Sequence, residues 1–275
     1  MHKKKEILEL LMTALILVCA FYVGRLGASI TASGEAEKEK SGEAASGVIN
    51  WEDGTAALEG QQEEEKTAAP EGLRQAQELT ERGITVVLDA GHGGIDAGKV
   101  GVNGALEKEI NLAIAKKLAD RLAKNGITAV LTRESDGGLY DEGEANKKQQ
   151  DMKRRCAAID AQSPLLAVSI HQNSYTESSV KGPQVFYYES SAPGKELAAD
   201  LQEALNEMLE IERPREIKAN DSYYLLRKTK SPIVIVECGF LSNPEEAEKL
   251  VTDDYQEKVA EAVCSGILAY VRDNG

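Results

Sequence analysis

Three features are scarce in this 275-residue chain, and each scarcity narrows what the protein can be. Cysteine occurs four times and never as a CxxC pair, so no disulfide framework is indicated. Basic residues are outnumbered, with 32 lysines and arginines against 46 acidic residues, and the formal net charge of −14 argues against a nucleic-acid partner. Histidine occurs only three times, as His2, His92 and His171. Any chemistry that depends on histidine must therefore use very few positions.

The excess negative charge is concentrated in the N-terminal third. Residues 31–82 contain thirteen acidic and five basic residues, together with many Glu, Ala, Gly and Ser and few large apolar side chains. Such a segment buries too little surface to fold alone, so residues 33–82 are predicted to be an acidic disordered linker, with at most transient helix. Residues 83–275 are ample for one hydrophobic core and are predicted to form a single folded domain.

The first 32 residues have the pattern of an N-terminal signal or membrane anchor. Three lysines, at positions 3–5, precede the uncharged run 10–23. Residues 7–30 are long enough to span a bilayer, and the mediocre cleavage site at 28–32 favours a retained anchor. Lysines before the run predict that the folded domain lies outside the cytoplasm. A buried helix of a globular protein is the less favoured alternative.

One glycine-rich stretch organises the rest of the chain. The apolar run 84–88 predicts a buried strand, which leads into the turn DAGHGG at 89–94. Glycines on both sides let the backbone turn tightly around His92, so that its imidazole can lie open at the end of the strand. The apolar run 165–170 leads in the same way to His171. Two histidines at matching strand ends are more typical of a site than of a core.

Strands and helices are predicted to alternate along the domain, which indicates an α/β fold with a sheet covered by helices on both faces. Strands are predicted at 84–88, 127–131, 165–170, 183–188, 223–226 and 233–236, and helices at 106–124, 142–162, 197–209, 244–250 and 255–271. In such a sheet, ligands bind beyond the carboxyl ends of the strands. His92, His171 and Glu237 each follow a predicted strand, and Glu107 lies at the start of a predicted helix.

These four residues form a candidate metal site. Two neutral imidazoles and one carboxylate are a frequent ligand set for catalytic zinc. The spacing is unlike the HExxH pattern of many metallopeptidases or the HxxxH pair of deacetylases, so the fold would have to assemble the ligands from separate elements. Simpler explanations exist: His92 in a phosphate loop, His171 in the core, or Glu107 favoured by a helix dipole. Glu237 is the hardest to explain in that way, because a carboxylate after the apolar run 233–236 would be buried without a task.

Taken together, the motifs resemble those of the zinc-dependent N-acetylmuramoyl-L-alanine amidases of the amidase-3 type, which are cell-wall hydrolases. The resemblance extends over residues 84–270, with Ala90 where the first motif usually has proline. It implies Zn²⁺ held by His92, Glu107 and His171, with Glu237 as the catalytic carboxylate. It also implies a single domain with a twisted, mostly parallel mixed sheet of about six strands. The motifs are DAGHGG (89–94), EKEINLAIA (107–115), TRESD (132–136), SIHQNS (169–174) and VECGFLSNPEE (236–246).

The reaction that the resemblance implies is hydrolysis of the amide bond between N-acetylmuramic acid and L-alanine in peptidoglycan. In this interpretation Glu237 accepts the proton of the attacking water and passes it to the leaving amine. Asp89 and Asn173 are expected either to support the ligands through hydrogen bonds or simply to cap turns. A non-catalytic peptidoglycan-binding module and a structural membrane-tethered domain are the alternatives from other functional classes.

Within this family, the short domain behind an N-terminal signal is similar to the amidases that prepare spore-cortex peptidoglycan for muramic δ-lactam formation. The segments KGPQVFYYES (181–190) and KANDSYYLLR (218–227) favour this subgroup. The protein would then act outside the cytoplasm, secreted or anchored at the cell wall, or in the space between the forespore and mother-cell membranes. A vegetative amidase of cell separation is the alternative, and an activating protein partner is left open.

Overall fold

The computed structural model describes residues 71–275, so the predicted anchor at 1–32 and most of the predicted linker lie outside the described residues. Within the described range, none of the helices is both long and apolar enough to cross a membrane. The strands are β1 (Thr85–Ala90), β2 (Thr128–Leu131), β3 (Leu166–Asn173), β4 (Gln184–Tyr188), β5 (Lys218–Asn220) and β6 (Ile233–Phe240). The helices are α2 (Glu71–Glu81), α3 (Glu107–Lys124), α4 (Lys147–Gln162), α5 (Ala192–Met208), α6 (Tyr224–Lys228), α7 (Pro244–Leu250) and α8 (Asp253–Asn274).

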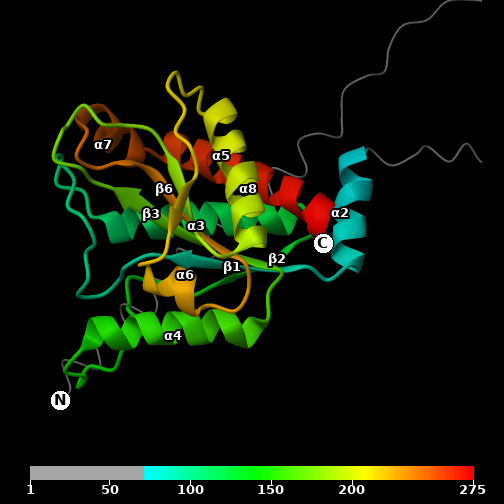
Figure 1. The fold of residues 1–275 in the computed structure, drawn as a ribbon, viewed down its shortest axis with the longest axis horizontal. Helices are drawn as coiled ribbons and strands as arrows, with labels where there is room; N and C mark the ends of the chain where they lie inside the picture. The colour runs from blue at the N-terminus through cyan, green and yellow to red at the C-terminus, as the bar shows by residue number, and fades with distance from the viewer. Residues whose placement is uncertain (1–70) are drawn as a thin grey trace, which may run out of the picture. The chain divides into compact units, whose positions relative to one another are not determined.

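The six strands form one mixed sheet in the order β2-β1-β3-β6-β4-β5 (Figure 1). The four strands β2, β1, β3 and β6 run parallel to one another, β4 is antiparallel to β6, and β5 is parallel to β4. The first halves of the central strands β1, β3 and β6 are mostly apolar because helices cover both faces, as is usual for parallel sheets. The prediction of an α/β domain with a mostly parallel, six-stranded sheet is confirmed.

Two helical layers cover the sheet, and strand alternation sends side chains to each. Helices α3, α5 and α8 lie on one face, and α4 with the short α6 lies on the other (Figure 1). In β1, Val86 and Leu88 join the larger core beneath the first layer, whereas Val87 joins the smaller core beneath the second. Asp89 therefore points with Val87 towards α4, because side chains two residues apart share a face. The site develops on this less covered face.

Strands β3 and β6 both run further than the apolar sequence predicts. His171 lies within β3 and Glu237 within β6, rather than just after each strand, and the two residues are partners in the parallel register. Because neighbouring strands lie about 4.8 Å apart, this register alone brings the imidazole and the carboxylate close together. The sheet thus contributes two of the four predicted site residues directly.

Three further differences from the predicted elements have local causes. The predicted strand at 223–226 is wrong: α6 forms there, after the Asn220 side chain accepts the N–H groups of Ser222 and Tyr223 and turns the chain. Strand β5 is missing from the prediction because it has only three residues. Helix α4 begins at Lys147 rather than 142, since the Asn146 side chain caps it by accepting the N–H of Gln149 at 3.1 Å.

Helix α2 occupies the last part of the segment that is predicted to be linker. It buries no residue completely, but Leu79 packs against the main core. Gly126 allows the close approach, because a Cβ at that position would overlap the backbone oxygen of Ala76. Just after the helix, the Arg82 guanidinium donates to the carbonyl of Val271 at 3.2 Å. Because α2 is mostly polar and charged, its sequence alone does not predict these contacts. The domain boundary at residue 83 stays a prediction.

Candidate metal site

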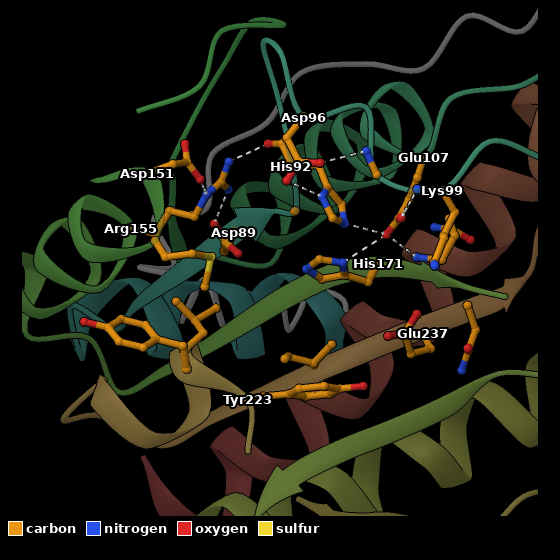
Figure 2. A pocket seen from close by; sticks show the side chains of 18 of the residues that line it. Asp89, His92, Asp96, Lys99, Glu107, Asp151, Arg155, His171, Tyr223 and Glu237 are labelled. Atoms are coloured by element: carbon orange, nitrogen blue, oxygen red, sulfur yellow. Dashed lines mark hydrogen bonds and ion pairs between the residues drawn. The ribbon is translucent and has the colours of Figure 1, made fainter. Parts of the chain in front are cut away.

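His92, Glu107 and His171 converge on one point at the carboxyl ends of β1 and β3 (Figure 2). Each offers one donor atom, and the three donor atoms lie within 4.8 Å of one another. Glu107 Oε1 lies 3.2 Å from His92 Nε2 and 3.0 Å from His171 Nδ1. The two imidazole rings meet edge to face, with their centroids 4.9 Å apart. The structure therefore brings together the three residues that the sequence predicts as metal ligands.

Each of these side chains comes from a different element. His92 lies in the loop after β1 in the left-handed region, at φ 63°. Glu107 is the first residue of α3 and is 2% exposed, and its carboxylate accepts the N–H groups of Lys99 at 2.7 Å and Gln172 at 3.1 Å. These backbone donors leave the carboxylate little freedom to rotate. The protein itself thus holds the Glu107 carboxylate in place.

The charge states of the set suit a metal. Burial alone would raise the pKa of Glu107, but hydrogen bonds with His171 and His92 hold it well below its usual range, so the carboxylate is ionised at neutral pH. The same pairing outweighs burial at His171 and raises the pKa of that imidazole. A divalent cation satisfies the carboxylate and both nitrogens at once, and its binding displaces the proton from the imidazole. Two histidines and one carboxylate, with space beside them, fit a catalytic zinc ion.

Glu237 faces the candidate ligands from β6 and is the least satisfied carboxylate in the site. Its side chain is 8% exposed, and its Oε2 is buried without a hydrogen-bond partner among residues 71–275. Burial raises the pKa of Glu237 to about 7, with the charge of Glu107 adding to the rise while His171 opposes it. A carboxyl group that titrates near neutrality, next to a metal site, is suited to accept and return a proton.

Asp96 is a supporting residue that the sequence reasoning missed. Its Oδ2 lies 3.1 Å from His92 Nδ1 and 3.2 Å from Lys148 Nζ. A carboxylate on the second nitrogen of a metal-binding histidine fixes the tautomer and orientation of the ring. The signal was an acidic residue four positions after His92 within the same glycine-rich loop, HGGID.

Asp89 and Asn173, the two predicted supporting residues, have other immediate partners. Asp89 is 1% exposed and accepts hydrogen bonds from Ser169 at 2.6 Å, Thr132 at 2.7 Å and Arg155 at 2.7 Å. Burial would raise the pKa of Asp89, but the charge of Arg155 and these hydrogen bonds lower it to about 2. Asn173 uses its side-chain oxygen to accept the N–H of the next residue, Ser174, at 2.8 Å.

The candidate ligands line a cavity of about 500 Å³. One part of its wall is polar and consists of the metal-site residues, and a second wall is formed by apolar and aromatic side chains. Tyr223 belongs to that second wall, and Figure 2 shows its ring across the cavity from His171 and Glu237. Its ring is backed by Phe186, with the centroids 5.7 Å apart. A large ligand with both apolar and polar groups can therefore reach the site. The second wall comprises Met152, Tyr223, Tyr224, Leu225 and Ile235.

Comparison with known proteins identifies the family to which this domain belongs. A family model described as N-acetylmuramoyl-L-alanine amidase matches residues 86–269, which include every residue of the candidate site. The germination-specific N-acetylmuramoyl-L-alanine amidase of Bacillus subtilis (strain 168) is 37% identical over 196 residues, covering 70% of this chain and 82% of the relative. The amidase AmiA of Escherichia coli (strain K12) is 32% identical over 231 residues, covering 67% and 75% respectively.

A solved structure agrees with this assignment. The CwlD amidase from Clostridioides difficile, determined in complex with the GerS lipoprotein, is similar with a TM-score of 0.67 and 39% sequence identity. The match covers 69% of this chain and 99% of that chain. The match therefore extends over nearly the whole of that solved chain.

Proposed function

The chain belongs to the N-acetylmuramoyl-L-alanine amidase family, and we propose that it is a zinc enzyme that acts on spore-cortex peptidoglycan. Its reaction is hydrolysis of the amide bond between N-acetylmuramic acid and L-alanine. The observation that supports metal dependence is the convergence of His92, Glu107 and His171, whose donor atoms lie within 4.8 Å of one another. Zinc is the ion proposed because two imidazoles and one carboxylate are a frequent ligand set for catalytic zinc.

His92, Glu107 and His171 would hold the zinc ion, which would supply Lewis acidity to polarise the scissile carbonyl and make water a stronger acid. Glu237 accepts the proton from the attacking water at its unpartnered Oε2. As the new carbon–oxygen bond forms and the carbon–nitrogen bond breaks, Glu237 returns this proton to the departing amine of L-alanine. The carboxylate is then regenerated, and it can perform both transfers because its pKa is raised by burial to about 7.

The residues around the ligands keep this arrangement in place during the reaction. Asp96 holds His92 through its Nδ1, so the opposite nitrogen faces Glu107. The backbone N–H groups of Lys99 and Gln172 hold the two oxygens of Glu107. The cavity beside them admits the muramic acid and the stem peptide, with the aromatic wall around Tyr223 available to the sugar ring.

The names of two similar proteins support the proposed role in the spore cortex. One is named a germination-specific amidase, and the other is the CwlD amidase. Removal of the stem peptide leaves the lactyl group of muramic acid with a free carboxylate, which is the chemical group that a δ-lactam requires. A vegetative amidase is the second candidate, because AmiA is 32% identical over a similar share of the chain.

The proposed place of action is outside the cytoplasm, at peptidoglycan, with the segment 1–32 as a signal or membrane anchor. The similar CwlD amidase was solved in complex with a lipoprotein. By analogy, a lipoprotein partner that lies on the same side of the membrane is proposed for this chain.

The test of the proposed function uses the full-length protein with purified peptidoglycan. Metal is removed with a chelator and restored as Zn²⁺, and peptides with a free L-alanine amino terminus are measured by mass spectrometry. Release that needs Zn²⁺ is expected, and release that is unaffected by complete metal removal would refute metal dependence. Cortex and vegetative peptidoglycan are compared side by side. Muramic δ-lactam is then measured in spores with and without the gene, and an unchanged content would refute the cortex role.

A further inference from the structure

The carbonyl groups of Ala90, the last residue of β1, and of Gly91 and His92 after it accept hydrogen bonds from buried polar side chains. Ala90 O accepts from Arg133 Nε and Arg155 Nη1, both at 2.8 Å. Gly91 O accepts from Arg133 Nη2 and from Asn111, both at 3.1 Å. His92 O accepts from Arg155 Nη2. The guanidinium groups of Arg133 and Arg155 therefore bind the backbone at the end of β1. Of the two, Arg155 is the one that donates to the carbonyl of His92, a candidate metal ligand.

Arg155 is held firmly in this position. Its side chain is 2% exposed, although it lies 63 residues along the chain from His92. Asp89 binds its Nη1 at 2.7 Å, and Asp151 binds its Nε at 2.5 Å. Figure 2 shows the guanidinium between these two carboxylates, beside the loop that carries His92. A buried charge that is paired on two sides and also donates to two carbonyls has a single orientation.

The loop needs such a restraint, because His92 has an unfavourable backbone conformation. A φ of 63° is uncommon for a residue with a side chain and persists only where the surroundings over-determine it. Nothing in β1 pairing fixes the His92 carbonyl, since the strand ends at Ala90. The Asp96 contact orients the imidazole from the other side but does not restrain this carbonyl.

We propose that Arg155 is a positioning residue for metal binding: it clamps the backbone of the His92 loop so that the imidazole meets Glu107 and His171. The inference rests on the proposed metal site. In this arrangement Asp89 contacts no candidate ligand; it orients Arg155, which in turn binds the His92 carbonyl. The chemistry is backbone restraint by a planar, multivalent donor, which lysine cannot reproduce because its ammonium is a point charge.

The test measures metal binding instead of turnover. Full-length wild type, Arg155→Lys, Arg155→Met and Asp151→Asn are stripped of metal and titrated with Zn²⁺ against a chromophoric chelator. The same proteins are loaded with Co²⁺, whose visible absorption depends on ligand geometry. Arg154→Met is the matched control, because Arg154 is the neighbouring arginine and forms only a surface ion pair with Asp141 at 2.6 Å. Far-UV circular dichroism of the metal-free proteins reports folding.

Arg155→Lys is expected to fold, because it keeps a positive charge between Asp89 and Asp151. Its Zn²⁺ affinity should fall about ten- to a hundredfold, the usual effect of losing a contact that orients a ligand, and its Co²⁺ spectrum should change. Arg155→Met should lose more, and Arg154→Met should match wild type in both measurements. Asp151→Asn should weaken Zn²⁺ binding less than Arg155→Lys and still alter the Co²⁺ spectrum.

The Asp151→Asn variant protects the test against misfolding at position 155. Asparagine keeps an oxygen for the N–H of Leu139, which Asp151 accepts at 2.6 Å, and replaces the charged oxygen that accepts from Arg155 Nε with an amide NH2 group, which cannot accept. Wild-type affinity and spectrum in folded Arg155→Lys would overturn the inference. If neither Arg155 variant folds, wild-type Zn²⁺ affinity and a wild-type Co²⁺ spectrum in Asp151→Asn would overturn the inference. Wild type that binds neither ion would instead refute the proposed zinc site, a distinct outcome.

Discussion

Gly91 lies directly against the imidazole of His171. A Cβ added to Gly91 would overlap the ring at Cε1 and Nε2 and would stand 2.8 Å from Cδ2. The contact explains why the loop after β1 and the end of β3 can approach so closely. A single methyl group at position 91 would therefore test whether the position of the His171 ring matters for metal binding.

Gly91→Ala is therefore expected to displace His171 and to weaken Zn²⁺ binding by at least tenfold, because the ring has to leave its position towards Glu107. Chelator competition measures the affinity, and amidase activity should fall in parallel. Gly143→Ala is the control, since a Cβ at that position meets nothing within 4 Å. Equal affinity in the two variants would mean that the His171 ring is not needed in the position described.

Glu237→Gln is expected to keep metal binding and to lose roughly 10²- to 10⁴-fold in kcat, because an amide cannot accept the proton of water. Glu248→Gln, a change on an exposed glutamate of α7, serves as the control. Peptide release measures activity, and chelator competition confirms that the metal is still bound. A variant that retained near-normal kcat would remove Glu237 from the reaction.

Activity should also depend on pH through the same carboxylate. The pKa of Glu237 is raised by burial to about 7, and the ionised form is the one that accepts a proton, so kcat/KM should rise as pH increases. A bound cation favours the ionised form, which places this acid limb at or below about pH 7. The pH profile of kcat/KM tests this for the wild-type enzyme. An acid limb above pH 8 would contradict the assignment.

Asp96→Asn is expected to lower Zn²⁺ affinity about ten- to a hundredfold, because Asp96 orients His92 through a contact of 3.1 Å between Oδ2 and Nδ1. Lys148→Met should change affinity far less, since Lys148 is largely exposed and pairs with Asp96 rather than with a candidate ligand. Chelator competition compares the two variants with wild type. An effect of equal size in both would show that the outer ion pair, rather than the imidazole contact, matters.

Asp89→Asn is expected to destabilise the domain by about 3–5 kcal/mol at pH 7, because it leaves Arg155 buried with one carboxylate fewer. The pKa of Asp89 is lowered to about 2 in the folded state, so its stabilisation is complete above about pH 4 and is lost as the pH falls towards 2. The difference between wild type and variant should therefore narrow below pH 4.

Urea unfolding between pH 7 and pH 3 measures this effect. Asp141→Asn is the control, because that carboxylate forms an exposed pair with Arg154 and should change the free energy of unfolding little at any pH in this range. A difference between wild type and Asp89→Asn that stayed constant down to pH 3 would show that the Asp89 charge is not the source of the stability.

Much of the site could be predicted because its residues follow strong local patterns. The apolar runs before His92, His171 and Glu237 identified the buried strands, and the rule that ligands bind at carboxyl strand ends placed their side chains at one edge. The three candidate ligands do meet there. The extra length of β3 and β6 was hidden, because both strands continue into polar residues that local hydropathy treats as loop.

The parts that could not be predicted depend on contacts between distant segments. Arg155 is one of three basic residues in a row on α4, and no local feature distinguishes it from its exposed neighbour Arg154. In the sequence, Asp96 looks like any acidic residue in a turn. Its contact with Nδ1 of His92 depends on the positive φ of His92, which local sequence does not reveal. The YYLL run at 223–226 has strand-like residues, but the Asn220 turn makes it begin a short helix.

The amino-acid sequence by itself determined which residues can take part in the chemistry and which strands carry them, because apolar runs, glycine turns and acid–imidazole motifs are local in the chain. The tertiary structure alone decided what holds them in place. The register of β3 against β6 pairs His171 with Glu237, and the packing of α4 against β1 buries Arg155 beside Asp89 and the His92 loop. Such contacts join residues up to 66 positions apart, and only burial in a common core makes them strong.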